Sequence, residues 1–389
     1  MIDTIVLTLS NGMFVLLNKD RFTPSASGLY DQSGAYRLGG RANMKCVQNP
    51  TADELKRGIY KPRLTLSKRP NRQGGFDIPL KIEFSAPKML FGNNFDELVD
   101  DDFQLLITKL KYTLKQMDVL VQEDHLVNAL VSAIHFSKNI PLTDYTTPYT
   151  YIKQLTKLNI NQRLDTNQTD YRNEGHSFKY RANSFEITFY DKIKDLQQAK
   201  RGKGRALEKD STLQLDLFDP LSKRKVFEVL RMEVRLGKRQ KLKQILSTIG
   251  LTIEPTFKNL FSQDITQKVL LHYIAEIESN YPHLLSYEYN TPEKFLTDFL
   301  ISNPKKRLTS ALKYLGMRVL FEKLGVREFR QLIGRYSDNA WYSLNSDMKS
   351  LTQVSEVNTF RLLRDSITNY QPLKLVDFQD KMINNDKYN

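Results

Sequence analysis

The spacing of apolar residues mixes strand and helix patterns in the first 237 residues or so and becomes almost entirely helical after that point. Before that point, short segments such as 78–85 and 226–236 alternate apolar with polar residues, which is typical of strands. After it, apolar residues recur three and four positions apart, which is typical of helices. The segments with this helical spacing are 241–249, 264–280, 292–301, 308–324 and 326–336. We therefore predict an α+β protein, with a mostly antiparallel sheet in a domain at 1–237 and a mostly helical domain at 238–389.

Local signals refine this outline in the first half of the chain. The pair Asn11-Gly12, between the apolar segments 2–9 and 13–17, predicts a hairpin. Segment 126–136 fits either a strand or a buried helix, because short apolar runs carry no decisive period. The polar, glycine-containing stretches that are expected to form loops are 24–43 and 200–211.

A helix pair near the end of the chain resembles a helix-turn-helix. Gly325 separates the last two helical segments, and the second of them carries Arg327, Arg330 and Arg335. Helix pairs joined through a glycine also occur in bundles that bind no DNA. Both interpretations of this pair therefore stay open.

The length and the cysteine content exclude several classes of protein. The chain has 389 residues and a single cysteine, Cys46. One cysteine cannot form an internal disulfide or a cysteine-based zinc site, which excludes a disulfide scaffold and a zinc finger. The segment from Met1 to Ser10 lacks the features of a signal peptide, and no apolar run approaches the roughly 20 residues that cross a bilayer. We expect a folded, cytoplasmic protein with no membrane partner.

The charge balance indicates a polyanionic partner. Lys and Arg number 58 and Asp and Glu 44, a net charge of +14, and the basic residues come in clusters. A basic surface of this kind most often binds nucleic acid, although it also suits a soluble protein without such a partner. The clustered residues that we expect to contact DNA are Lys238, Arg239, Lys305, Lys306 and Arg307.

The segment 183–192 contains a candidate nucleophile. If 184–190 is a strand, Glu186, Thr188 and Tyr190 lie on one face, while the intervening apolar residues point to the core. A phenol with a pKa of about 10 needs a neighbouring base or positive charge before it can attack, and Lys192 could supply that charge. The alternative is an ordinary surface tyrosine at the end of a strand.

The strand predicted at 226–236 carries a second polar pattern. Arg231, Glu233 and Arg235 alternate with apolar residues and therefore lie on one face. A carboxylate between two arginines can form a structural salt-bridge network. It can also act as a metal ligand or base while the arginines bind phosphates.

Two further strands present polar side chains in the same way. Glu83 lies between Lys81 and Ser85 on one side of a strand, and His135 alternates out of an apolar segment. A lone histidine is more often a satisfied structural residue than a ligand. Several strands that each present a Glu, His or Tyr could nevertheless build an oxygen-and-nitrogen site for Mg²⁺ or Mn²⁺.

These patterns occur together in one known family. The matching pieces, in chain order, are Met1-Ile2-Asp3, the stretch from Ser85 to Asn94, Phe136-Ser137, Tyr190-x-Lys192 and Arg231-x-Glu233-x-Arg235. With these pieces the chain resembles the replication initiators of filamentous phages, of the gene II endonuclease type, and related rolling-circle initiators of phages and plasmids. The stretch that ends at Asn94 and the Arg-x-Glu-x-Arg strand are the more specific matches.

The resemblance implies a divergent HUH-like nuclease that nicks one DNA strand at an origin and later rejoins it. Tyr190 would form a covalent 5′-phosphotyrosine, with Lys192 and Glu233 assisting and a divalent metal polarising the phosphate. The chain departs from the HUH pattern because it has no His-hydrophobic-His pair. The ligand set implied in compensation is His135 and Glu83, with Glu186 or Glu233.

The resemblance also implies the partners. The first is origin DNA, both as duplex and as single strand, with Arg231 and Arg235 among the residues that contact it. The others are a host helicase and a host polymerase. One alternative is an origin-binding initiator or repressor without nuclease activity. Another is a transposase or relaxase that shares the chemistry. The sequence leaves the oligomeric state and the choice of metal open.

Overall fold

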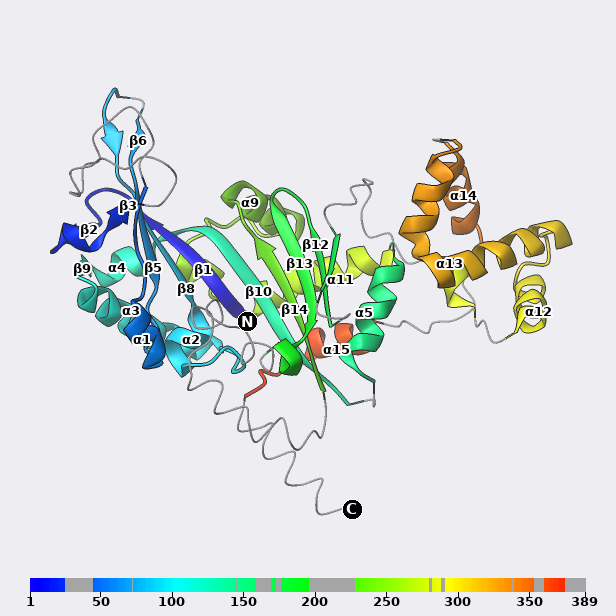
Figure 1. Ribbon diagram of the computed structural model, residues 1–389, viewed down its shortest axis with the longest axis horizontal. Coiled ribbons are helices and arrows are strands. Elements are labelled where there is room, and N and C mark those ends of the chain that lie inside the picture. Colours follow the sequence, from blue (N-terminus) through cyan, green and yellow to red (C-terminus); the bar gives the residue numbers. More distant parts are fainter. Residues whose placement is uncertain are drawn as a thin grey trace, which may run out of the picture.

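A computed structural model gives the arrangement of most of the chain (Figure 1). It describes residues 1–24, 45–71, 73–143, 146–158, 169–172, 176–195, 228–279, 282–287, 291–337, 339–352 and 360–374. Apart from Pro24, the loops predicted at 24–43 and 200–211 lie outside these residues.

The described residues form one large sheet in which each pair of neighbouring strands is antiparallel. Its ten strands, in spatial order, are β11 (Thr169–Arg172), β12 (Ser177–Arg181), β13 (Phe185–Asp191), β14 (Glu228–Leu236), β10 (Leu130–Leu142), β1 (Ile2–Leu9), β8 (Leu80–Ser85), β5 (Arg63–Ser67), β4 (Lys45–Gln48) and β3 (Thr23–Pro24). The first strand of the chain therefore lies in the middle of the sheet, between β10 and β8. The strands predicted at 78–85, 184–190 and 226–236 are confirmed as β8, β13 and β14, with slightly different ends, and residues 226–227 lie outside the described residues.

The hairpin predicted at Asn11-Gly12 is wrong. A turn does form there, with Gly12 at φ 89°, but β2 (Phe14–Leu16) pairs with β9 (Val119–Val121) in a separate small sheet. Both edges of β1 are already occupied by β10 and β8, so no hydrogen-bonding edge remains for β2. A second small sheet joins β6 (Arg69–Pro70) to β7 (Phe76–Asp77).

Helices dominate after β14, as the change in period predicts. The elements that the structure describes before it are α1 (Ala52–Lys56), α2 (Ala86–Phe91), α3 (Phe103–Gln116), α4 (Glu123–Val127) and α5 (Pro148–Lys157), with short 3₁₀ turns η1 (Lys19–Arg21) and η2 (Asp100–Asp102). Those after it are α9 (Arg239–Thr248), α10 (Phe257–Leu260), α11 (Gln263–Ser279), η5 (His283–Ser286), α12 (Pro292–Ser302), α13 (Leu308–Gly334), α14 (Ala340–Lys349) and α15 (Arg361–Asn369). The α+β class is therefore confirmed. The ambiguous segment 126–136 contains the end of α4 and the start of β10.

The hydrophobic core continues across the change of period. Helices α9 and α11 pack against β10 and β14, α15 packs against β10, and one cluster of buried side chains joins the sheet to these helices. Helices α12, α13 and α14 lie at one end of the molecule, where α13 contacts α5 (Figure 1). The division at residue 237 thus separates strands from helices while several of the helices complete the core of the sheet. Two independent domains remain a prediction.

A buried ion pair links the middle of the sheet to the C-terminal segment. Lys138 of β10 and Glu97 are both almost fully buried, and the Lys138 Nζ lies 2.5 Å from a Glu97 carboxylate oxygen. The Glu97 carboxylate also accepts hydrogen bonds from the backbone N–H groups of Asn139, at 2.6 Å, and Leu373, at 2.8 Å. The Lys138 Nζ donates a second bond to the Gln371 carbonyl at 2.7 Å. The pair therefore ties the end of the described chain to β10.

Replacing Lys138 by methionine should destabilise the protein strongly. The Glu97 carboxylate would remain buried without its cation, which costs about 3–5 kcal/mol. Urea unfolding measures this cost. Lys111→Met is the matched control, since the Lys111–Glu123 pair is solvent-exposed and worth less than about 1 kcal/mol. An equal decrease in the free energy of unfolding in both variants would show that the buried pair stabilises the protein no more than the exposed pair does.

Candidate metal and nucleophile site

Three adjacent strands present their polar residues on one face in matching register. Across β13, β14 and β10, the aligned rows are Glu186, Arg235 and His135; Thr188, Glu233 and Ser137; and Tyr190, Arg231 and Asn139. The side-chain alternation predicted for 184–190 and 231–235 is therefore confirmed. The sheet topology adds that these patterns are neighbours, which alternation alone cannot specify.

A β-bulge adds Asp3 to this face. On β1, Ile2 is opposite Phe136 and Ile5 is opposite Ile134, so Asp3 and Thr4 together face the single residue His135. Ile2 and Ile5 are buried while Asp3 and Thr4 are only partly buried, so both intervening side chains point away from the core. Such bulges redirect side chains and are common next to functional sites.

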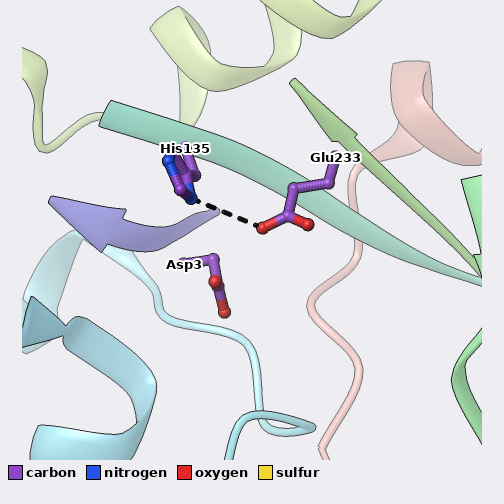
Figure 2. Close-up of side chains that lie close together, drawn as sticks. All are labelled: Asp3, His135 and Glu233. Atoms are coloured by element: carbon purple, nitrogen blue, oxygen red, sulfur yellow. Dashed lines mark ion pairs between the residues drawn. The ribbon is translucent and has the colours of Figure 1, made fainter. Parts of the chain in front are cut away.

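Asp3, His135 and Glu233 form a compact group from three neighbouring strands (Figure 2). One ligand atom from each residue lies within 4.8 Å of the other two, and the His135 Nδ1 is 3.7 Å from a Glu233 oxygen. Ligands on opposite sides of an octahedral Mg²⁺ are about 4 Å apart, so small side-chain adjustments would bring all three atoms onto one ion. Two carboxylates and an imidazole suit Mn²⁺ or Mg²⁺, and water would complete the coordination.

The protonation states of two of these residues suit a metal. Burial lowers the pKa of His135, against the attraction of Glu233, so that its imidazole is neutral at neutral pH. Burial would raise the pKa of Asp3, but the positive charges of Arg231 and Lys192 outweigh it and hold that pKa well below its usual range. A neutral imidazole and an ionised carboxylate are the forms that bind metals.

Arg231 forms hydrogen bonds that orient Asp3 and the residues around it. Its Nη2 donates to Asp3 at 2.7 Å and to the Ser137 hydroxyl at 3.0 Å, while its Nη1 donates to the Asn94 carbonyl at 2.8 Å and to the Asn139 side chain at 3.2 Å. The residue is 2% exposed. Hydrogen bonds of this kind fix the orientation of metal ligands. They favour a positioning role for Arg231 over the DNA contact that we expected from the sequence.

Arg235 and Glu186 form a salt-bridge network beside the group. The Arg235 guanidinium contacts Glu233 at 2.6 Å and Glu186 at 2.8 Å, and Lys179 contacts Glu186 at 3.0 Å. Arg235 is about one-third exposed and can still face a bound strand. Glu186 neutralises two cations here and does not belong to the three clustered ligands.

Glu83 also lies apart from the cluster. It is exposed on β8, where it pairs with Val6 of β1, and β1 separates it from His135. Of the ligands expected from the sequence, the structure therefore brings together His135 and Glu233. Asp3 completes the group in place of Glu83, which the sequence predicts as a ligand.

Tyr190 lies beside this group, directly across from Arg231. Burial raises the pKa of Tyr190 well above its usual value, and the positive charge of Arg231 opposes that shift. The phenol is therefore protonated at neutral pH and needs positive charge nearby when it attacks. Lys192 is fully buried, and its Nζ lies 5.9 Å from the centre of the Tyr190 ring. It can act on the charge of Tyr190 without reaching the surface.

The basic residues expected to contact DNA occupy two separate places. Lys238 is exposed and Arg239 is half-buried at the start of α9, next to the end of β14. Lys305 and Arg307 are exposed between α12 and α13, where Lys306 donates to the Ser350 hydroxyl at 3.2 Å. The predicted break at Gly325 is confirmed, with φ 80° inside α13. Arg330 in the second half of this helix is buried and lies 5.7 Å from the Trp341 ring.

Asp3 and Asn94 lie in the pieces that resemble the initiator family, but the sequence predicts a role in the site for neither of them. Asp3 is a charged residue inside an otherwise apolar strand segment, which is a usable signal, but its direction depends on a bulge. Asn94 acts from a loop and carries no periodic signal.

No helix in the described residues is long and apolar enough to span a membrane. Comparison with protein-family models, with curated proteins and with solved structures finds no match.

Proposed function

We propose that this protein is a rolling-circle replication initiator that nicks and rejoins one strand of DNA through a covalent tyrosine intermediate. One observation carries the proposal. Tyr190 and the group of Asp3, His135 and Glu233 lie on the same face of four adjacent strands. The resemblance to gene II type initiators and the net charge of +14 support the same activity and a DNA substrate.

The chemistry is a transesterification at phosphorus. The Tyr190 oxygen attacks the scissile phosphate, and the bond from phosphorus to the 3′ oxygen breaks. The upstream strand leaves with a 3′ hydroxyl, which takes up a proton, and the downstream strand stays on Tyr190 through its 5′ phosphate. Because one phosphodiester replaces another, the reverse attack can reseal the strand without ATP.

The residues around Tyr190 have distinct tasks in this reaction. The phenol must lose its proton as it attacks, and Arg231 and Lys192 make the resulting negative charge less costly. Asp3, His135 and Glu233 would hold Mg²⁺ or Mn²⁺, which supplies Lewis-acid stabilisation of the phosphate oxygens. Arg235, partly exposed at the edge of this group, is available to a phosphate of the bound strand.

Capture of the covalent adduct tests the proposal. A randomised single-stranded DNA library labelled at its 3′ end is incubated with the protein and Mn²⁺, and the products are separated on a denaturing protein gel. A 5′-phosphotyrosine leaves the label on the protein. A DNA-binding initiator or repressor without nuclease activity leaves none. A transposase or relaxase would give the same adduct. The sequence of the captured DNA distinguishes them from a replication initiator, whose captured DNA should lie beside a replication origin.

The basic cluster between α12 and α13 should contribute to duplex affinity. Replacing Lys305, Lys306 and Arg307 by alanine should flatten the slope of log Kd against log salt by up to about 3 units, since each phosphate contact contributes about 0.9. Fluorescence anisotropy over a salt series measures the slope. The control is the triple alanine variant of Lys109, Lys111 and Lys115, exposed on α3, which changes net charge equally. The same change in slope in both variants would indicate a general charge effect without a defined contact.

A further inference from the structure

The loop after α2 reaches the proposed active site from outside the sheet. It begins at Gly92, which adopts a left-handed conformation with φ 77° and ends α2. The Asn93 side-chain oxygen then accepts hydrogen bonds from the N–H groups of Phe95 and Asp96, both at 2.9 Å. These bonds fix the backbone on both sides of Asn94 without using the Asn94 side chain.

The far end of the same loop is attached to β10. The Asn139 side chain donates to the Phe95 carbonyl at 2.7 Å, and the Glu97 carboxylate accepts from the Asn139 backbone at 2.6 Å. Asn139 belongs to the polar face, in the same row as Arg231 and Tyr190. The loop is therefore held in a fixed position relative to the nucleophile.

Asn94 contacts both cations that lie near Tyr190. Its side-chain Oδ1 accepts a hydrogen bond from the Lys192 Nζ at 2.8 Å, and its backbone carbonyl accepts one from the Arg231 Nη1 at 2.8 Å. Lys192 has a long, flexible side chain and is fully buried. An ammonium in such a place needs oriented acceptors to keep its charge in one position.

We propose that Asn94 is a positioning residue that fixes the Lys192 ammonium beside Tyr190 for the attack on DNA. The inference rests on the proposed function and adds a residue that does not touch the substrate. Substitution of the Asn94 side chain leaves its backbone contact with Arg231 intact. A side-chain variant therefore removes the contact with Lys192 and keeps the backbone contact with Arg231.

The test is a double-mutant cycle on the rate of adduct formation with the labelled DNA library. Lys192→Ala should slow the reaction by roughly 10²–10⁴-fold. Asn94→Ala should slow it by roughly 10-fold or more, the effect of losing a hydrogen bond to a charged group, with DNA affinity nearly unchanged. In the Lys192→Ala background, Asn94→Ala should cause almost no further loss, because the group that it positions is gone. Asn94→Asp, which keeps the acceptor, should retain more activity than Asn94→Ala.

Two further variants separate positioning from folding. Asn94→Leu keeps the side-chain volume without the acceptor and should reproduce the loss seen with Asn94→Ala. Asn128→Ala, an exposed asparagine after α4, should leave the rate unchanged. Full additivity of Asn94→Ala and Lys192→Ala would overturn the inference while the adduct of the wild-type protein upholds the proposed function. The absence of any Tyr190-dependent adduct in the wild-type protein would overturn both.

Discussion

Tyr190→Phe should abolish the covalent adduct with DNA. The variant loses only the attacking oxygen, so the rate should fall by at least about 10⁴-fold while affinity for single-stranded DNA stays within a few fold. The loss reflects chemistry and not packing, since phenylalanine fills nearly the same space on β13. The measurement is adduct formation on a denaturing gel, with DNA binding followed separately by anisotropy.

The matched control is Tyr180→Phe. Tyr180 lies on β12, pairs with Ile187 and points to the core, so removal of its hydroxyl should leave adduct formation intact. If Tyr190→Phe still forms an adduct, peptide mapping will identify the tyrosine that carries the DNA. One alternative is Tyr60, whose hydroxyl accepts a hydrogen bond from the Ser85 N–H, next to the strand that carries Asp3. An adduct on Tyr60 would reject Tyr190 as the nucleophile.

The periodicity of the sequence predicts which residues share a face, and the structure confirms this for β13 and β14. Glu186, Thr188 and Tyr190 alternate on one strand, and each pairs with a polar residue of the neighbouring strand. In the helical half, α9, α11, α12 and α13 follow the predicted segments, including the break at Gly325, whereas α10, α14 and α15 have no predicted counterpart. These features depend on local spacing, which is fully present in the sequence.

Local spacing does not specify the order of the strands in the sheet. This explains why Glu83, which the sequence predicts as a metal ligand, lies outside the cluster. Neighbouring strands lie about 4.8 Å apart, so residues two strands apart are separated by about 10 Å. Glu83 on β8 is two strands from His135, because β1 lies between β8 and β10. Glu186 is also two strands from His135, because β14 lies between them. Asp3 and Glu233 are each on a strand adjacent to β10 and can meet His135 directly.

The buried polar residues of β10 were equally hard to foresee. Alternation places Lys138 on the opposite side from Ser137 and Asn139, yet all three are buried. Lys138 is buried because Glu97 and the segment near Leu373 are folded against it, and these lie far away in the sequence. A sequence pattern predicts burial only where burial follows the period of a single strand or helix. The burial of Lys138 depends on contacts with residues that are distant in the sequence.

Removal of the divalent metal should stop adduct formation, and each residue of the three-strand group should be needed to bind it. EDTA should abolish the reaction. Asp3→Asn, His135→Ala and Glu233→Gln should each raise the Mn²⁺ concentration required by more than about 10-fold, since each removes or weakens a ligand. Calorimetric titration with Mn²⁺ alone measures the same loss without DNA. Tyr190→Phe should bind Mn²⁺ normally, which separates metal binding from nucleophilic attack.

Glu83→Gln and Glu186→Gln are the decisive controls, because each removes one negative charge from the same sheet. Neither carboxylate belongs to the clustered ligands, so both variants should keep the metal requirement of the wild-type protein. The pH dependence gives a second check. Because burial lowers the pKa of His135 below its ordinary value of 6.5, protons should compete with the metal for this residue only in acid solution. If Glu83→Gln weakens Mn²⁺ binding and Asp3→Asn does not, the metal lies on the β8 side of β1 and the bulge at Asp3 serves another purpose.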